Sequence, residues 1–405
     1  MPRPGRRALG LTVGSVLLFV IGTNNQAGWL LVMSSLLIGA VIAGMVFPLL
    51  TVRRVEVERW SPTEVFQGEE VRIEVRVRNQ GRGPKLSLAV EDLHVRPATL
   101  WVGYLGPGEQ ATITTVRRAT RRGVHQAEPF VVSSSAPFGV ARSRRTVGAD
   151  GRTVVYPRVV LLSQGPSTGR LRPAHEQSRP PWQRGGGQDF VAVREYRMGD
   201  SMRHVHWPST ARVGSLMVRE FEREIPHRVG VLIDTRADIG VEETPLDLCC
   251  SAAASMAVAS LDRAAVVHLL AARGGKLDRD TAMDTGAALN WLARLPPGGG
   301  LPLSAALEEA APVLRECDTV VLTFPTWQEN GAGRVRSKVR SVQSLGPRVV
   351  AVMVRAETYE PDGRSPSVLT AGAVDALAQA LAADGVALGA VGAGDDLAAC
   401  LDGLQ

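Results

Sequence analysis

The sequence has 405 residues, of which 45% are hydrophobic and 21% are charged, a composition that excludes a disordered chain and predicts two or three folded units. The formal net charge of +6 is compatible with nucleic acid, anionic lipid headgroups or an acidic protein as a partner, and it does not choose among them. Four cysteines without a CxxC pair argue against a disulfide framework and a zinc finger, and we expect them to be reduced and mostly buried.

Two uncharged apolar runs near the N-terminus predict a transmembrane helical hairpin over residues 1–50. The run Ala27–Leu50 is free of charge for 24 positions. As a helix it would extend about 36 Å, enough to cross a hydrocarbon core of roughly 30 Å. The run Ala8–Gly22 is shorter, and it spans only if Arg7 snorkels or Thr23 joins the helix.

The charges that flank these runs predict the orientation of the chain. Three arginines precede the first run and two follow the second: Arg3, Arg6, Arg7, Arg53 and Arg54. Since basic flanks stay in the cytoplasm, both termini are expected there, with only the polar turn 23–26 on the other side. The chain would then be a two-helix protein of the cell membrane. A signal peptide over residues 1–22 is the alternative.

Residues 51–160 are expected to form an all-β, immunoglobulin-like sandwich. Val71–Arg78 alternates strictly between apolar and charged residues, which is typical of a strand with one buried and one solvated face. Turn residues such as those at 106–108 separate further short strands. The other expected strands are Val55–Glu58, Lys85–Val90, Ala111–Val116, Ala127–Ser133, Val140–Thr146 and Thr153–Tyr156.

An arginine run in this region has two interpretations. Arg117, Arg118, Arg121 and Arg122 form either a solvated strand end or loop, or a contact for anionic lipid or for an acidic partner surface.

Residues 161–228 are expected to connect the β region to the C-terminal domain. Ser163–Gly187 is rich in Pro, Gly, Ser and Arg, which predicts an extended linker. The stretch Gly185–Arg212 that follows is dense in Arg, Asp, Tyr, Trp and His, and no core pattern explains it.

Within this stretch, Gly199 and Asp200 predict a turn whose carboxylate bonds backbone N–H groups or Arg203. Arg194, Arg203 and Arg212 are each able to form a fork with a carboxylate.

The stretch resembles the signature of the DUF58 family, a family of unknown function. The family pattern runs from Arg-Glu-Tyr through Gly-Asp and Arg to Trp and Ala-Arg. Its anchors are present as Arg194, Glu195, Tyr196, Gly199, Asp200, Arg203, Trp207, Ala211 and Arg212. Arg-Arg-Gly at 121–123, Pro-Phe-Gly at 137–139 and the paired N-terminal helices also resemble the family. We expect these signature residues either to join the two domains or to bind a partner.

The resemblance implies partners and no particular reaction. Members of the family are typically encoded beside a MoxR-type AAA+ ATPase, and sometimes beside a transglutaminase-like membrane protein. We therefore expect such an ATPase as the partner, with the transglutaminase-like protein as a further candidate. The lipid bilayer is the other expected partner, and nucleic acid is not expected.

Residues 229–405 are expected to form an α/β domain with a parallel sheet that resembles a von Willebrand factor A domain. Apolar strands alternate with helices here, as in sheets that are covered on both faces. The expected strands are Val229–Asp234, Ala265–Leu270, Thr319–Phe324, Arg348–Val354 and Val386–Val391, and the expected helices are Leu246–Leu261, one near Ala282–Leu295, and Leu303–Leu314.

Asp234 stands where an A-type domain begins its metal site, which resembles Asp-x-Ser-x-Ser with oxygen ligands suited to Mg²⁺. Arg236 and Asp238 occupy the two serine positions, and Leu301 and Phe324 occupy the positions of the other ligands. The resemblance therefore implies a degenerate site that holds no metal. Asp234 is expected to pair with Arg236 or to cap the next helix, and no cofactor is expected.

No catalytic residue is assigned, since the sequence lacks GxSxG, HExxH and Walker motifs and His204 and His206 have no apparent third ligand. We expect a non-enzymatic, membrane-anchored scaffold or adaptor that works with a MoxR-type AAA+ ATPase in assembling or remodelling membrane or envelope complexes. One alternative is a protein that binds anionic lipid or nucleic acid through the arginines of the β region. The other is an unrecognised hydrolase.

Overall fold

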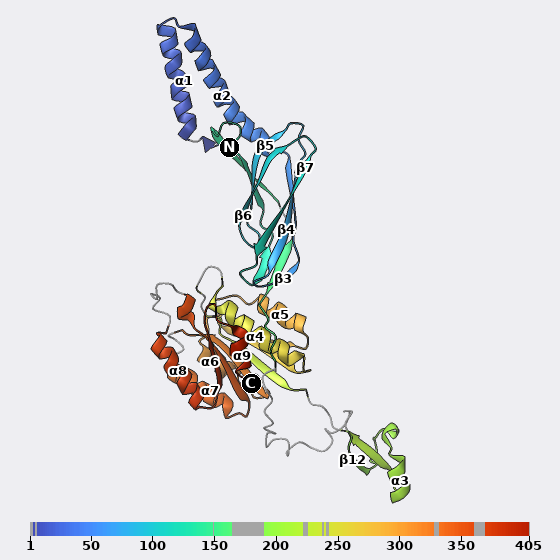
Figure 1. Ribbon diagram of the computed structural model, residues 1–405. Coiled ribbons are helices and arrows are strands. Elements are labelled where there is room, and N and C mark those ends of the chain that lie inside the picture. Colours follow the sequence, from blue (N-terminus) through green and yellow to red (C-terminus); the bar gives the residue numbers. More distant parts are fainter. Residues whose placement is uncertain are drawn as a thin grey trace. The chain divides into compact units, whose positions relative to one another are not determined.

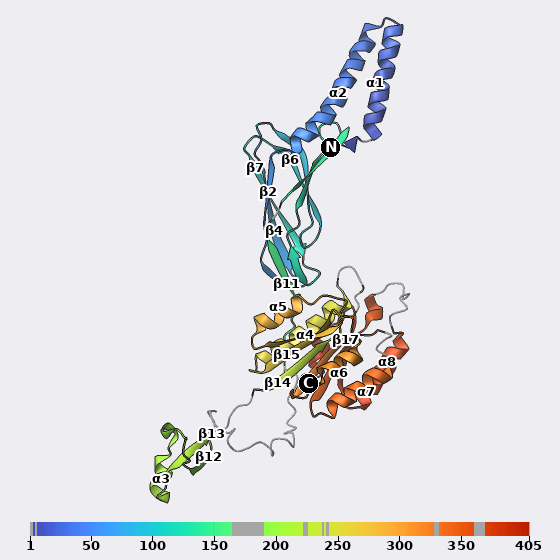
Figure 2. The ribbon, with the colours of Figure 1, turned by 180° about the vertical axis from the view of Figure 1, so that it is seen from behind.

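The computed structural model describes residues 3–4, 6–148, 150–163, 190–221, 226–236, 239, 243–327, 332–359 and 369–404. The chain forms two compact units (Figure 1 and Figure 2). The first unit comprises Met1–Arg158 and Leu292–Arg294, and the second comprises Val159–Trp291 and Leu295–Gln405. Most of the predicted linker Ser163–Gly187 lies outside the described residues.

The first unit begins with two helices that pack against each other, α1 (Arg6–Asn24) and α2 (Gly28–Val52). Among the described residues, α2 alone has the length and composition of a membrane-spanning helix, and only 11% of its apolar window is buried. The apolar part of α1, Ala8–Asn24, is shorter. The prediction of an apolar, membrane-type helix near the N-terminus is therefore confirmed for α2.

Several hydroxyl side chains in these helices bond to backbone carbonyls, which satisfies them without water. Ser34 Oγ donates to the carbonyl of Ser15 at 2.8 Å and so joins the two helices. Thr23 lies inside α1, where its hydroxyl donates to the carbonyls of Phe19 and Val20. Thr23 thus extends α1, as the sequence allowed.

Two β-sheets then enclose one core. One sheet has the order β2-β4-β7, the other has the order β1-β10-β9-β5-β6, and a smaller sheet has the order β3-β11-β8. Val71, Ile73, Val75 and Val77 of β4 are fully buried, as their alternation predicts, and they share a core with Phe130 and side chains of the second sheet. The predicted sandwich is confirmed. The strands are β1 (Arg3–Pro4), β2 (Val55–Trp60), β3 (Glu64–Phe66), β4 (Glu70–Asn79), β5 (Lys85–Asp92), β6 (Ala98–Leu105), β7 (Gln110–Arg118), β8 (Gly123–Gln126), β9 (Phe130–Ser134), β10 (Ala141–Val147) and β11 (Arg152–Tyr156).

The second unit contains a six-stranded sheet with the order β16-β15-β14-β17-β18-β19. The pairs β15–β14, β14–β17, β17–β18 and β18–β19 are parallel. The strands are β14 (Arg228–Ile233), β15 (Val266–Arg273), β16 (Lys276–Ala282), β17 (Thr319–Pro325), β18 (Arg348–Val354) and β19 (Ala387–Val391). The helices are α4 (Pro245–Leu261), α5 (Thr285–Ala293), α6 (Leu303–Leu314), α7 (Ala332–Gln343), α8 (Ala371–Ala383) and α9 (Leu397–Asp402), with a 3-10 turn η5 (Ala356–Tyr359).

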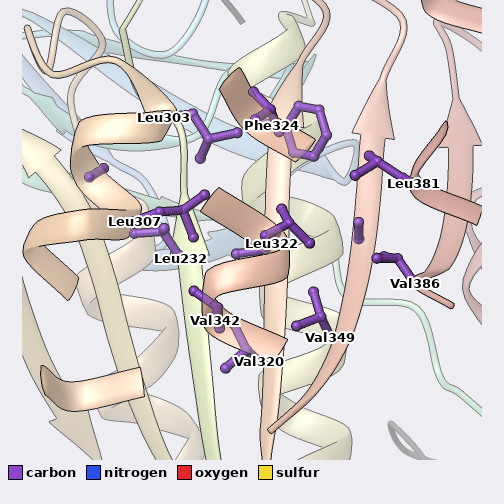
Figure 3. Packing of buried hydrophobic residues seen from close by; sticks show 14 of the residues in the cluster. Leu232, Leu303, Leu307, Val320, Leu322, Phe324, Val342, Val349, Leu381 and Val386 are labelled. Atoms are coloured by element: carbon purple, nitrogen blue, oxygen red, sulfur yellow. The ribbon is translucent and has the colours of Figure 1, made fainter. Parts of the chain in front are cut away.

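Figure 3 shows the apolar core between this sheet and the helices α6, α7 and α8. Leu232, Leu322 and Phe324 point from the central strands toward Leu303 and Leu307 of α6. Successive strand residues face opposite sides of the sheet, so the alternate residues of β14 and β17 face the side on which α4 packs. Helices thus cover both faces, which is why the central strands are almost continuously apolar.

One prediction for this domain was wrong. The sheet is mixed and not parallel, because β16 pairs with β15 antiparallel through the turn at Gly274 and Gly275. The helix expected near Ala282–Leu295 is present as α5, which begins at Thr285 because Ala282 ends β16. The polar sequence of β16 suits an edge strand that solvent reaches from one side. Because this sequence contains no apolar run, no pattern predicts the strand.

Candidate functional site

The signature stretch forms a small module of its own, residues 190–221, which we call the signature module. It consists of β12 (Phe190–Glu195), a 3-10 turn η3 (Met202–His204), α3 (Trp207–Val213) and β13 (Met217–Phe221). β12 and β13 pair antiparallel, with Arg194 opposite Val218 and Glu195 opposite Met217. The helix and the turn thus lie within the connection of a two-stranded sheet.

An arginine–carboxylate fork closes the turn that follows β12. Arg194 Nη1 donates to Asp200 Oδ2 at 2.7 Å, and Arg194 Nη2 donates to Asp200 Oδ1 at 2.8 Å. The backbone N–H of Arg197 also donates to Asp200 Oδ2, at 2.8 Å. Gly199 has a φ of +107°, a conformation that L side chains rarely adopt. The fork predicted for Arg194 is present, and of the two partners predicted for Asp200 the backbone N–H is confirmed, whereas the arginine that pairs with it is Arg194 and not Arg203.

These bonds keep Asp200 ionised. The Arg194 guanidinium is the main cause, and with the Arg197 N–H it lowers the pKa of Asp200 from 3.8 to about 2. A bidentate, charge-assisted pair of this kind fixes orientation as well as distance. Asp200 therefore stabilises the conformation of the turn.

A second set of bonds ties α3 to the strands. The Thr210 hydroxyl donates to the carbonyl of His206 at 3.1 Å and accepts the N–H of Met217 at 3.0 Å. Ser209 Oγ lies 2.7 Å from His206 Nδ1 within the first turn of the helix. Gly214, with a φ of +80°, ends the helix in the left-handed conformation usual for a C-terminal glycine. The module therefore has a defined shape.

The module nevertheless buries few apolar side chains. Of those that the structure describes in residues 193–219, Val205 and Val218 are the buried apolar ones. Trp207 at the start of α3 is 64% exposed. The large exposed apolar side chains of the module are Met198, Met202, Trp207, Val213 and Leu216.

Some of the remaining signature residues make hydrogen bonds within the module, and others lie on its surface. Glu195 accepts a hydrogen bond from the Ser215 hydroxyl at 3.4 Å, and Tyr196 is half-buried with its N–H bonded to the carbonyl of Leu216 at 2.8 Å. Arg203 and Arg212 are exposed, and neither makes a fork to a carboxylate among the residues that the structure describes. The surface set is therefore Arg203, Trp207 and Arg212.

The carboxyl end of β14 is the other predicted position. Asp234 is buried there and pairs with Arg236, with Nε–Oδ1 at 3.1 Å and Nη2–Oδ2 at 2.9 Å. The prediction that Asp234 pairs with Arg236 is thus confirmed. Phe324, at a position where an A-type site would need a ligand, is fully buried in the core. In the described part of the chain, no group of three His, Cys, Asp or Glu side chains could hold a metal ion.

Residues 192–300 match a family model described as "Protein of unknown function DUF58". The chain contains a DUF58 domain. The match begins two residues before Arg194 and ends at Gly300, so it takes in all but the first two residues of the signature module, Asp234 and the first half of the α/β sheet. Both positions predicted from the sequence, the signature stretch and Asp234, thus lie within the matched residues.

Comparison with solved structures gives likenesses that each cover 25% of this DUF58 chain. They include the CARDB domain of the PF1109 protein from Pyrococcus furiosus (19% identity, 91% of that chain, TM-score 0.19). Others are the Pseudomonas fluorescens alkylpurine DNA glycosylase AlkC (16% identity, 30% of that chain, TM-score 0.16) and a beta-glucosidase from Listeria innocua (18% identity, 16% of that chain, TM-score 0.15). No curated protein matches the sequence.

Sequence reasoning missed the exposed methionines and leucine of the DUF58 signature module. Met198, Met202 and Leu216 belong to no helical or strand period, so they carry no pattern that predicts burial or exposure. Their large size within an otherwise polar stretch was the available signal. Thr210, which connects α3 to β13, was missed for a similar reason: a mid-helix threonine is unremarkable until its neighbours are known.

Proposed function

We propose that this DUF58 protein is a membrane-anchored adaptor without catalytic activity, and that its signature module docks a partner protein in the cytoplasm. In this proposal α1 and α2 both cross the membrane, and both termini are cytoplasmic. The sandwich is of immunoglobulin type. The α/β domain is of von Willebrand factor A type, with Arg236 in place of a metal at Asp234.

The observation that carries the proposal is the surface of the signature module. Its backbone is fixed by the Arg194–Asp200 fork and by Thr210, yet Trp207 and the other large apolar side chains named above are exposed. A unit of about 30 residues with two buried apolar side chains gains little stability from its own core. Exposed apolar side chains on a rigid frame are typical of a protein interface.

The residue types at this surface also favour a protein partner. Trp and Arg are the residues most enriched among those that dominate binding energy at interfaces, and Arg203, Trp207 and Arg212 are of these types. The described carboxylates of the turn are engaged, since Asp200 is held by Arg194 and Glu195 by Ser215. Because Asp200 is held by Arg194, this arrangement favours docking over general acid–base chemistry by that carboxylate.

The expected partner is a MoxR-type AAA+ ATPase, as the family resemblance implies, with a transglutaminase-like membrane protein as a further candidate. The ATPase would act on a membrane or envelope complex that the adaptor brings to it.

Site-specific photo-crosslinking in membranes tests the proposal. A benzophenone amino acid at position 207 is expected to capture an AAA+ ATPase, whereas the same probe at position 101 is not. Trp101 of the sandwich is a matched control, because it is 67% exposed, close to the 64% of Trp207. Capture at position 207 of this chain's own α/β domain alone would instead establish the module as a clasp between domains and would refute the docking role.

The alternative based on the arginine run is weakened by the structure. Arg117 is buried and contacts Asp92 at 2.8 Å, and the Arg118 side chain donates to the carbonyl of Gly68 at 3.0 Å. Both residues lie at the C-terminal end of β7. The N-terminal end of β7 is the one on the side of the helices, since Gln110 there pairs with Arg78, which is next to Asn79. Arg117 is therefore not part of a free basic surface, and this part of the run lies away from α2.

The hydrolase alternative predicts that replacing Asp200 removes turnover without unfolding the protein. The fork to Arg194 favours a structural role for this carboxylate. Asp200→Asn is accordingly expected to loosen the turn, which is measurable without a substrate.

A further inference from the structure

Exposed apolar side chains lie along α2 from Trp29 to Leu50. At about 1.5 Å per residue these two residues lie about 32 Å apart along the axis, close to the roughly 30 Å of a hydrocarbon core. The exposed apolar residues between them are Val32, Met33, Leu36, Ile38, Ile42, Met45, Val46 and Phe47.

The other side of the last third of α2 is covered by the sandwich. Gly44, Pro48 and Thr51 are buried, and α2 packs against β5, β9 and β10. A Cβ atom at Gly44 would lie 2.8 Å from Val140 Cβ, so the helix backbone directly contacts the chain where it enters β10. The same stretch of helix thus faces outward on one side and the sandwich on the other.

Hydrogen bonds hold this contact between α2 and the sandwich, which we call the joint, in place. Lys85 Nζ at the start of β5 donates to the carbonyls of Leu50 at 2.6 Å and Arg53 at 2.8 Å, which are free at the end of a helix. The chain before α1 is attached to the same end of the sandwich, because Arg3 of β1 pairs with Arg142 of β10. Both helices therefore connect to one end of the sandwich.

The joint sets the depth of the turn between β9 and β10. Gly44 lies about 22 Å from Trp29 along the helix, which leaves about 9 Å to Leu50. Val140, which contacts Gly44, is therefore level with apolar side chains of α2 that face outward. Phe138 belongs to the same turn, two residues away, and it is 52% exposed. An exposed aromatic ring at this depth would meet lipid and not water.

We infer that the β9–β10 turn, residues 135–140, inserts into the cytoplasmic leaflet of the membrane that α2 crosses, with Phe138 as its anchor. The inference rests on the proposed membrane anchoring and goes beyond it, since the sandwich itself becomes a lipid-binding domain. Arg53 and Arg54, which are exposed directly after α2, would contact anionic headgroups at the same surface.

Fluorescence quenching in vesicles of phosphatidylcholine and phosphatidylglycerol tests the inference on the full chain. An NBD label is placed on Phe138→Cys, on Ile42→Cys in the middle of α2, or on Leu93→Cys. Leu93 is a matched control, because it is exposed and follows β5 at the end opposite to Lys85. All variants carry Cys400→Ala, since the other three cysteines are buried.

Label at position 138 is expected to be quenched by nitroxide-labelled acyl chains several-fold more strongly than label at position 93, and iodide should show the reverse order. If position 42 is quenched by lipid but position 138 is quenched by iodide, the inference fails and the anchoring stands. If neither quencher reaches position 138, protein covers the turn, and the inference fails as well. If position 42 itself escapes the lipid quencher, the proposed anchoring fails.

Discussion

At the scale of single residues, the Arg194–Asp200 fork is the contact that shapes the signature module. Arg194→Lys keeps the charge but removes one of the two parallel bonds, because an ammonium group is a point charge. We expect amide hydrogen exchange in residues 190–221 to become about fivefold faster, which corresponds to about 1 kcal/mol for a partly exposed pair. Arg203→Lys is the control, since Arg203 is exposed and should exchange like the wild type. Equal rates in both variants would show that the fork does not hold the module.

The same fork predicts how the module responds to acid. The pKa of Asp200 is about 2 in the folded protein and 3.8 ordinarily, so the pair stabilises the folded turn fully above about pH 4. That contribution is lost as the pH falls toward 2. Pepsin cleavage within the module should therefore accelerate between pH 4 and pH 2 in the wild type. Asp200→Asn should already be cleaved fast at pH 4, and a wild-type-like profile in this variant would contradict the assignment.

Gly44 is the residue on which the helix–sandwich joint depends. An added methyl group would lie within 2.9 Å of both Cβ and Cγ2 of the buried Val140, so Gly44→Ala must push the helix and β10 apart. We expect a loss of about 1–3 kcal/mol, the usual cost of overpacking, visible as a lower Tm in detergent. Gly39→Ala on the same helix meets nothing within 4 Å and should leave the Tm unchanged. A similar Tm for both variants would mean that the joint is loose.

At the scale of elements, the sandwich contains a buried charge cluster that joins three strands. Asp92 at the end of β5 pairs with Arg59 of β2 and with Arg117 of β7, and all three side chains are almost fully buried. The Arg59 guanidinium also stacks on the Phe130 ring, 4.4 Å from its centroid. One carboxylate thus balances two buried arginines, which leaves a net positive charge in this cluster.

Asp92→Asn should therefore be severely destabilising, because it leaves both arginines buried without a counter-charge. The expected cost is about 3–5 kcal/mol, measured by thermal or urea unfolding of the full chain in detergent. Glu91→Gln is the adjacent control: its pairs with Arg142 and Arg144 are partly exposed and should be worth at most about 1 kcal/mol. Comparable losses for the two substitutions would refute the view that burial decides the difference.

The elements that could be predicted from the sequence are those with a strong period. The strict alternation of Val71–Arg78 predicts β4, and the apolar runs predict β14, β17 and β18. β16 could not be found in this way, because an exposed edge strand needs no apolar face. The helix α8, Ala371–Ala383, is rich in alanine and was likewise missed, since small residues give a weak period.

The site could be predicted in its position but not in its pairing. The family signature located Arg194, Asp200 and Trp207, and the chemistry of arginine predicted a fork. Arg194 and Arg203 are six and three residues from Asp200, so spacing alone could not choose between them. The strand pairing of β12 with β13 decides it. For Arg117 the position itself could not be predicted. A basic run in a sequence favours solvent-exposed side chains, but the fold buries this member of the run.

At the scale of the whole molecule, the proposal joins an apolar anchor at one end of the sequence to an exposed recognition module in its middle. α2 supplies the apolar length, and the joint at Gly44 and Lys85 makes the sandwich a direct continuation of that helix. The DUF58 region, in contrast, carries the surface formed by Arg203, Trp207 and Arg212. An adaptor needs both, since recognition at the membrane requires that the recognising surface be held there.

The orientation of the chain is the prediction on which this arrangement depends. The arginines beside the helices predict that the turn 23–26 is outside and that both termini are inside. A cysteine in place of Gln26 should therefore react in intact cells with a membrane-impermeant maleimide, whereas one in place of Gln405 should react only after lysis. Gln26 is exposed between the helices, so failure to label it could not be attributed to burial. Labelling of position 405 from outside would reverse the orientation and place the signature module where no cytoplasmic ATPase can reach it.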